Sequence, residues 1–104
     1  MNPGFVYIMS NKTRSTLYVG VTSDLTSRVL EHKLGIGSKF TSKYKCFDLI
    51  LYEDFDLITD AIDREKQLKN WHREWKLNLI RDMNPYMKDL SFEIGLHPDD
   101  LKPI

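Results

Sequence analysis

The stretch LYVGVTSDLTSRVLEH, residues 17–32, decides how this chain folds. Its first residues are β-favouring and predict a strand that ends near Val21. Ser23 or Asp24 then offers a side chain that can cap a helix. The helix is expected to run to about Leu34, because two glycines follow within the next three positions. The stretch therefore predicts a strand that leads directly into a capped helix.

Upstream of this stretch, residues 5–9 are apolar and predict a partner strand. Residues 10–15 are polar and predict the turn that joins the two strands. A symmetric hairpin about this turn places Tyr7 opposite Tyr18 on one face of the sheet, although a bulge would break that pairing. Gly20 carries no side chain, so a partner backbone or a ligand can approach closely there.

Downstream of this stretch, the sequence predicts one more strand and two more helices. Residues 35–45 contain glycine and lysine and predict an exposed loop, and residues 47–53 predict the third strand. A second helix is expected from about residue 58 to beyond residue 71, and a third over 75–83 before Asn84-Pro85. The expected fold class is α+β, a small three-stranded antiparallel sheet flanked by helices.

The second helix carries an apolar stripe at steps of three and four residues. Trp71 and Trp75 continue this stripe and are expected in the core. Glu65 lies on the stripe, three residues after Ile62 and three before Leu68. A buried carboxylate is costly unless something pairs with it. Glu65 therefore either sits at the edge of the stripe beside a lysine or arginine, or it has a chemical role.

Length and composition indicate one small globular domain. The chain has 104 residues with 41% hydrophobic and 29% charged residues, which is ordinary for a soluble protein. No apolar run approaches the roughly 18 residues that cross a membrane, and the N-terminus has no signal-peptide pattern. Cys46 is the single cysteine, so no internal disulfide can form. We expect a cytoplasmic protein with a domain over residues 1–90 and a polar, partly ordered C-terminal tail over residues 91–104.

Charge is distributed unevenly although the formal net charge is zero. Residues 1–46 hold seven lysine or arginine residues and two acidic ones, a net of +5, whereas residues 47–63 hold six acidic residues and no basic ones. Bulk attraction to nucleic acid is therefore excluded as the main mode of binding. A local phosphate-facing surface in the first half fits this pattern, and a solvated lysine face fits it equally well.

Five spaced residues carry the chemistry: Tyr7, Tyr18, Arg28, His32 and Glu65. Tyrosine can accept or relay a proton, and histidine can assist it. Arginine neutralises a phosphate oxygen with its planar fork of donors. A carboxylate binds a hard metal cation. Together these types suit the hydrolysis of a phosphodiester.

These five residues, in this order and spacing, resemble the conserved set of the GIY-YIG nuclease superfamily. Residues 17–25 followed by Arg28 and His32 are especially similar to its small stand-alone bacterial members. Later segments that resemble the same subgroup are Phe40-Thr41 with Tyr44, Leu51-Tyr52-Glu53 and Arg64-Glu65-Lys66-Gln67-Leu68-Lys69. The resemblance covers roughly residues 4–90. It departs in the first triplet, which is Phe5-Val6-Tyr7, and only its tyrosine carries chemistry.

The resemblance implies a metal-dependent DNA endonuclease that uses Mg²⁺ or Mn²⁺. Glu65 would be the metal ligand, and Arg28 would stabilise charge on the phosphate. Tyr7 and Tyr18 would line the site, and His32 would assist the proton transfer. Which tyrosine activates the attacking water stays open. Glu65 is the single carboxylate among the five matched site residues, which argues against a two-metal mechanism.

Several further interpretations concern partners. Lys43 and Tyr44 in the basic loop are candidate DNA contacts. Asn78 and Asn84 are candidates for an asparagine that many relatives carry after the metal-binding helix. A structure-selective nuclease linked to DNA repair or recombination, monomeric or weakly homo-oligomeric and independent of membranes, is the expected form. The alternative is a non-catalytic module that binds nucleic acid or a protein and retains the nuclease fold.

Overall fold

A computed structural model describes residues 2–97 of the chain. Its elements, in chain order, are β1 (Gly4–Ser10), β2 (Leu17–Thr22), α1 (Leu25–Lys33), α2 (Lys39–Lys43), β3 (Asp48–Phe55), α3 (Ile58–Asn70), α4 (Arg73–Met83) and the short 3₁₀ helix η1 (Ser91–Ile94). The three strands form one antiparallel sheet in the order β2-β1-β3. The predicted α+β class and the three-stranded antiparallel sheet are confirmed.

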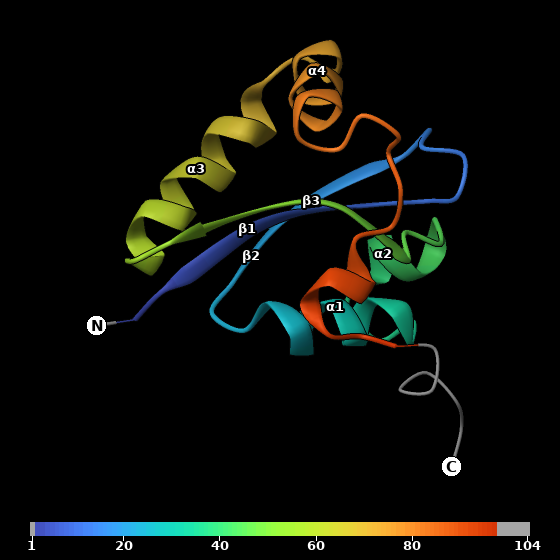
Figure 1. Cartoon of the computed structure of the whole chain (residues 1–104), viewed down its shortest axis with the longest axis horizontal. Helices are drawn as coiled ribbons and strands as arrows, with labels where there is room; N and C mark the ends of the chain where they lie inside the picture. The colour runs from blue at the N-terminus through green and yellow to red at the C-terminus, as the bar shows by residue number, and fades with distance from the viewer. Residues whose placement is uncertain (1, 98–104) are drawn as a thin grey trace.

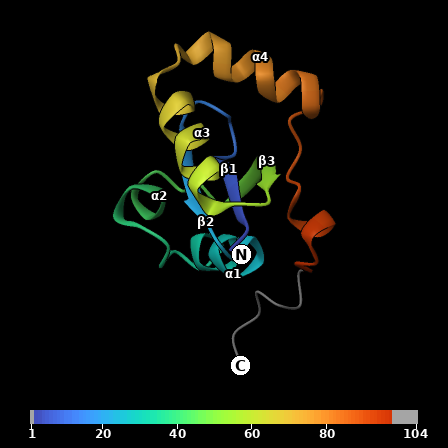
Figure 2. The same cartoon turned by 90° about the vertical axis from the view of Figure 1, so that its left-hand side faces the viewer.

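Helices cover both faces of the sheet (Figure 1). α3 and α4 lie over one face, and α1, α2 and η1 lie over the other, as the turned view also shows (Figure 2). Side chains of β1 alternate between the two faces, as in any strand. Val6 and Ile8 join the cluster under α3 and α4, whereas Tyr7 and Met9 join the cluster that includes Val29 of α1. Tyr7 therefore faces α1.

The register between β1 and β2 differs from the symmetric hairpin expected from the sequence. Tyr7 lies opposite Gly20, and Met9 lies opposite Tyr18. The turn spans residues 11–16 and not the expected residues 10–15, because the Thr16 amide donates to the side-chain oxygen of Asn11 (2.9 Å) and closes a loop between Ser10 and Leu17. The stagger equals two residues, so both tyrosines still project from the same face of the sheet.

The strand-to-helix step after β2 is confirmed. Asp24 is the N-cap of α1, and its carboxylate accepts a hydrogen bond from the Ser27 amide (3.2 Å). α1 then ends at Lys33. Its buried residues Leu25 and Val29 pack on the sheet.

The prediction of an exposed loop over residues 35–45 is wrong, because α2 forms inside it. Ser38 caps this helix by accepting a hydrogen bond from the amide of Thr41 (3.0 Å). Thr41 is buried and bonds to the distant His32 (2.9 Å). Local pattern did not predict α2, because a helix of five residues depends on such a tertiary contact.

The second predicted helix is shorter than expected. α3 ends at Asn70, and Trp71 takes an extended backbone conformation before α4 begins. This break resets the helical phase, so that Ile80, and not Trp75, faces the core. Trp71 is partly buried against the core, but the expectation that Trp75 is a core residue is wrong, since it is 54% exposed.

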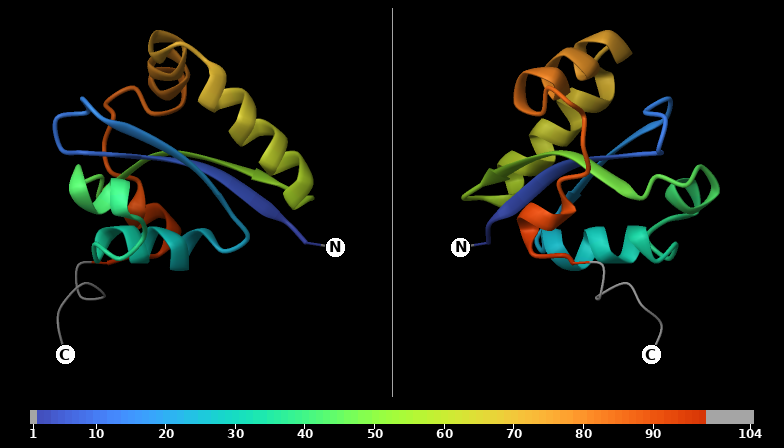
Figure 3. Two further views of the ribbon diagram at one scale, coloured as in Figure 1. Left: turned by 180° about the vertical axis from the view of Figure 1, so that it is seen from behind. Right: turned by 45° about the vertical axis from the view of Figure 1, so that its right-hand side comes forward.

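The chain returns along β3 after α4 (Figure 3). The Leu90 amide donates to the Leu49 carbonyl (2.7 Å), and the Leu49 amide donates to Asp89 (3.0 Å). Leu96 then reaches the core cluster beneath α1. The part of the expected tail that the structure describes therefore packs against the sheet and α1, and residues 98–104 lie outside the described residues. A domain boundary at residue 90 stays a prediction.

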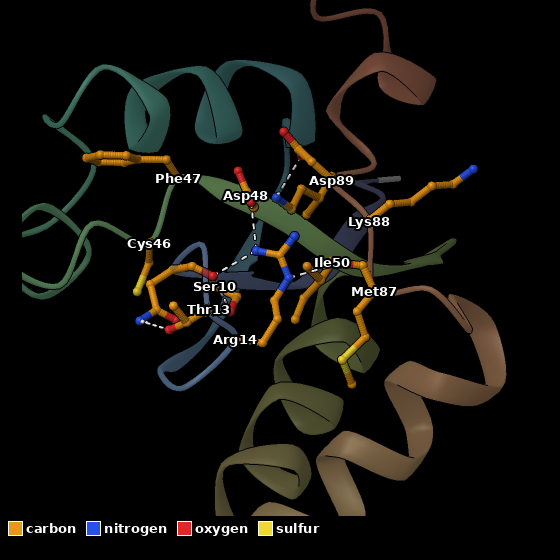
Figure 4. Close-up of polar contacts among 12 residues, drawn as sticks. Ser10, Thr13, Arg14, Cys46, Phe47, Asp48, Ile50, Met87, Lys88 and Asp89 are labelled. Carbon is orange, nitrogen blue, oxygen red and sulfur yellow. Dashed lines mark hydrogen bonds and ion pairs between the residues drawn. The ribbon is translucent and has the colours of Figure 1, made fainter.

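Arg14 ties this returning segment to the β1–β2 turn (Figure 4). Its guanidinium donates to the Met87 carbonyl (2.9 Å), to the Asn11 carbonyl (2.7 Å) and to the Asp48 carboxylate (2.7 Å). Three segments far apart in the sequence are thereby fixed together.

Within residues 2–97, no helix has both the length and the apolar character needed to span a membrane.

Candidate active site

A buried chain of hydrogen bonds begins at Tyr7. The Tyr7 hydroxyl lies 2.8 Å from Nε2 of His32, and Nδ1 of His32 lies 2.9 Å from Oγ1 of Thr41. Oγ1 of Thr41 is in turn 2.8 Å from Oγ of Ser38. β1, α1 and α2 thus each contribute to one network. It links the sheet to both helices on this face and orients the imidazole from both of its nitrogens.

The imidazole of His32 is held neutral. Burial, together with the positive charge of Arg28, lowers the pKa of His32 to about 4. A neutral imidazole donates at one nitrogen and accepts at the other. His32 can therefore satisfy both Tyr7 and Thr41 at once, and it has one lone pair that can take a proton.

Arg28 lies beside the Tyr7 phenol. Burial raises the pKa of Tyr7 to about 12, while a hydrogen bond from the Arg28 guanidinium opposes that rise. Arg28 also forms an ion pair with Glu31 (3.2 Å) on the solvent side of α1. Since a phenol with this pKa stays protonated near neutral pH, the Tyr7 hydroxyl is available as a donor to the adjacent Nε2 of His32.

Two glycines allow the Tyr7–His32 pair to form. A Cβ atom on Gly20 would overlap the ring of Tyr7, and one on Gly37 would overlap the ring of His32. The close approach expected at Gly20 is therefore made by the ring of Tyr7 from the neighbouring strand. No local pattern predicted a close approach at Gly37, because its neighbour comes from α1.

Tyr18 completes an aromatic group at the site. Its ring centroid lies 6.4 Å from that of Tyr7, 5.4 Å from that of His32 and 5.8 Å from that of Phe40. These separations are those of packed aromatic pairs. The structure thus brings Tyr7, Tyr18, Arg28 and His32 together.

Glu65 lies on α3, at the edge of its apolar stripe. Its side chain is 16% exposed and forms an ion pair with Lys69 one turn later (3.4 Å). This is the pairing with a nearby lysine that the stripe predicted as one alternative. α3 lies over the opposite face of the sheet from α1, but it contacts β2, the edge strand that carries Tyr18 (Figure 1). Among residues 2–97, no hydrogen bond or ion pair joins Glu65 to the tyrosine–histidine–arginine cluster.

The donor set at Glu65 is compatible with a single hard cation. No group of three or more histidine, cysteine, aspartate or glutamate side chains that could hold a metal occurs within the described part of the chain. Mg²⁺ keeps several waters and takes one or two carboxylates together with substrate oxygens, so a single carboxylate suffices. The Lys69 ammonium is mostly exposed and can leave the carboxylate at little cost.

Other motif residues have structural roles. Arg64 binds Glu53 of β3 through two hydrogen bonds (2.8 and 3.2 Å) and fixes α3 to the sheet. Asn84 is buried and donates to the Ile50 carbonyl (3.1 Å), so it anchors the end of α4. Asn78 is exposed and accepts from Arg81 (3.5 Å).

The candidate DNA contacts Lys43 and Tyr44 lie at the end of α2. Both are exposed, and the Lys43 ammonium lies 5.2 Å from the centre of the Tyr44 ring. Sequence reasoning did not assign a site role to Thr41, although Phe40-Thr41 belongs to the segments that resemble the nuclease subgroup. The hydrogen bond of Thr41 to His32 gives that segment its place in the site.

His32 should make folding stability depend on pH. Because its pKa falls from 6.5 to about 4 on folding, the unfolded chain binds a proton between these values that the folded chain does not. This stabilisation is complete above pH 6.5 and is lost as the pH falls toward 4. Urea denaturation measures the free energy of unfolding of wild type and His32→Gln across this pH range. That free energy should change less steeply with pH in the variant. The exposed His72→Gln is the matched control, and an equal slope for wild type and His32→Gln would refute the assignment.

The structure is thus a small α+β domain in which a tyrosine–histidine pair with an adjoining arginine lies on a three-stranded antiparallel sheet. Residues 3–78 match the GIY-YIG catalytic domain family. The chain belongs to the GIY-YIG family.

Relatives at moderate identity are small staphylococcal proteins. The chain is 34% identical to a UPF0213 protein of Staphylococcus saprophyticus over 82 residues, which cover 79% of this chain and 99% of the relative. It is 33% identical to a UPF0213 protein of Staphylococcus epidermidis and 34% identical to one of Staphylococcus aureus, over the same shares of each chain. No solved structure matches the chain.

Proposed function

We propose that this protein is a metal-dependent endonuclease that hydrolyses phosphodiester bonds in DNA. Membership of the GIY-YIG family supports the nuclease class. The observation that carries the proposal is the 2.8 Å contact between the Tyr7 hydroxyl and Nε2 of His32, with Arg28 beside the same phenol. These three groups supply a proton acceptor, a relay and a phosphate ligand in one place.

Tyr7 is the residue that we assign to the attacking water. It takes a proton from the water while its own hydroxyl proton passes to Nε2 of His32. The resulting hydroxide attacks phosphorus as the opposite P–O bond breaks, and the leaving alkoxide takes up a proton from solvent. When Nε2 accepts the Tyr7 proton, Nδ1 donates to the adjacent Thr41 hydroxyl, which stabilises the imidazolium that forms. Tyr18 lacks a comparable contact to His32 through its hydroxyl among the described hydrogen bonds, so it is assigned to packing and substrate placement.

Arg28 and Glu65 complete the proposed site. The planar guanidinium of Arg28 suits a phosphate oxygen, where negative charge accumulates during attack. Glu65 would hold Mg²⁺ or Mn²⁺, which supplies Lewis-acid stabilisation of phosphate charge when bound. Lys69 next to Glu65 has an exposed ammonium that is free to reorient when the carboxylate takes another partner.

DNA is the proposed partner, through the site and the neighbouring basic α2 segment with Lys43 and Tyr44. We further propose a cytoplasmic protein, active as a monomer or weak homo-oligomer, that acts on structured DNA during repair or recombination. Few basic contacts predict weak binding with clear salt dependence.

Incubation with nicked, flapped and branched DNA tests the proposal. Purified protein should cleave at least one of these substrates in Mg²⁺ or Mn²⁺ and none of them in EDTA. Gel separation of end-labelled strands measures the products. Wild type that binds these DNAs but never cuts them, with either metal, would favour a nucleic-acid-binding module.

A further inference from the structure

A row of aromatic rings leads away from the candidate active site across α2. Tyr18, which packs against His32, lies 5.8 Å from Phe40 between ring centroids. Phe40 in turn lies 4.7 Å from Tyr44, one turn further along α2. We call Tyr18, Phe40 and Tyr44 the aromatic row. It connects the site to the outer surface of the domain.

The outer two rings are open to solvent. Phe40 is 42% exposed and Tyr44 is 43% exposed, although each is packed on its neighbour. Scattered exposed aromatics are common, but two in contact and continuous with an active-site tyrosine form a surface. Such a surface can accept a further flat ring by stacking.

The charge around this surface is positive. Residues 33–45 contain four lysines and no acidic residue. Lys33 is bound to Asp89, whereas Lys39, Lys43 and Lys45 take part in no ion pair among residues 2–97. An aromatic surface bordered by unpaired lysines complements a flat base that is attached to a phosphate.

A cavity of about 480 Å³ continues the aromatic row past Tyr44. Tyr44 and Phe47 line it together with Lys12 and Lys45. Asp48 also lines the cavity, but its charge is neutralised by the ion pair with Arg14. The Phe47 side chain points away from this ion pair (Figure 4). This volume lies in the range of small-ligand sites.

From these observations we infer that the aromatic row binds unpaired nucleotides of a DNA strand next to the bond to be cleaved. Base–aromatic stacking requires an exposed base face, which a continuous duplex hides, and sites for single strands combine aromatic platforms with basic grooves. The inference rests on the proposed nuclease function for the position of the cleaved bond. It assigns the substrate class as DNA with a single-stranded segment.

Fluorescence anisotropy in EDTA tests this inference apart from cleavage. Wild type should bind a labelled single-stranded oligonucleotide more tightly than the blunt duplex of the same sequence. Phe40→Ala and Tyr44→Ala should each weaken single-strand binding roughly tenfold, the loss of one stacked base, and should weaken binding of the blunt duplex far less. Tyr86→Ala removes a 90% exposed tyrosine beyond α4 and should change neither affinity.

Phe40→Leu and Tyr44→Leu guard against loss of fold, because leucine keeps the apolar packing of α2 but has no ring face. Both should retain the thermal midpoint of wild type and still lose single-strand affinity. Full affinity in the leucine variants, or equal losses on single strand and duplex, would overturn the inference.

Cleavage assays separate this inference from the proposed function. A wild type that cuts blunt duplex as fast as flapped or single-stranded DNA would remain a nuclease and would sink the inference alone. If wild type cuts no DNA but binds single strands more tightly than duplex, and loses this preference in the Phe40 and Tyr44 variants, the proposed nuclease function is wrong. The inference of a single-strand binding surface would then stand.

Discussion

Glu65→Ala should abolish metal-dependent DNA cleavage and leave the fold intact. Glu65 is the proposed metal ligand, and loss of the metal removes several kcal/mol of transition-state stabilisation. Each 1.4 kcal/mol is a factor of ten, so we expect a fall of at least roughly a thousandfold in single-turnover rate. The only ion pair that Glu65 forms among residues 2–97 is with the exposed Lys69, so the thermal midpoint should change little.

Two further variants give this prediction its control. Glu65→Gln keeps the size of the side chain and should be as inactive as alanine, because a neutral amide binds Mg²⁺ poorly. Lys69→Ala removes the partner in the ion pair and should retain most of the activity. Cleavage that persists in both Glu65 variants would point to a contaminating nuclease, and equal losses in Glu65→Ala and Lys69→Ala would make the ion pair itself the important feature.

Arg28→Ala should lose turnover and keep stability. Arg28 is partly exposed and pairs with Glu31 at the surface, an interaction worth about 0–1 kcal/mol. Removing one preorganised donor to transition-state charge costs roughly 100- to 1000-fold in rate. Single-turnover cleavage and thermal denaturation of the same preparations measure both effects. Arg28→Lys keeps the charge without the planar fork and should recover only part of the rate.

Arg64 offers the matched comparison for Arg28. It binds Glu53 through two hydrogen bonds and lies over the Trp71 ring at 5.1 Å, so its role is to hold α3 on the sheet. Arg64→Ala should therefore lower the thermal midpoint more than Arg28→Ala does, and it should leave more of the cleavage rate. The opposite ranking, or parallel losses of stability and activity in Arg28→Ala, would mark Arg28 as structural.

The sequence was sufficient for features that local chemistry determines. A helix cap was expected at Ser23 or Asp24, and Asp24 is the residue that caps α1. The spacing of Arg28 and His32 puts them on one face of that helix. The three strands follow from apolar segments bounded by turns. The resemblance to GIY-YIG nucleases pointed to the four residues that the structure brings together, which are Tyr7, Tyr18, Arg28 and His32.

Features that depend on distant contacts were predicted poorly. The register of Tyr7 and Tyr18 depends on how Asn11 closes the turn, and α2 depends on the bond between Thr41 and His32. Trp75 was assigned to the core because the stripe was extended across a break that begins at Trp71.

The central claim is that Glu65 and the Tyr7–His32–Arg28 cluster act on one phosphate through one metal ion. Crystals of the wild-type protein soaked with saturating Mn²⁺ test it most directly, because manganese is located by its anomalous scattering. We expect an ion bound to the Glu65 carboxylate in an open cleft that Arg28 and both tyrosines line. An ion bound elsewhere, or a Glu65 that stays on Lys69 and faces away from Tyr7 at saturating Mn²⁺, would contradict it.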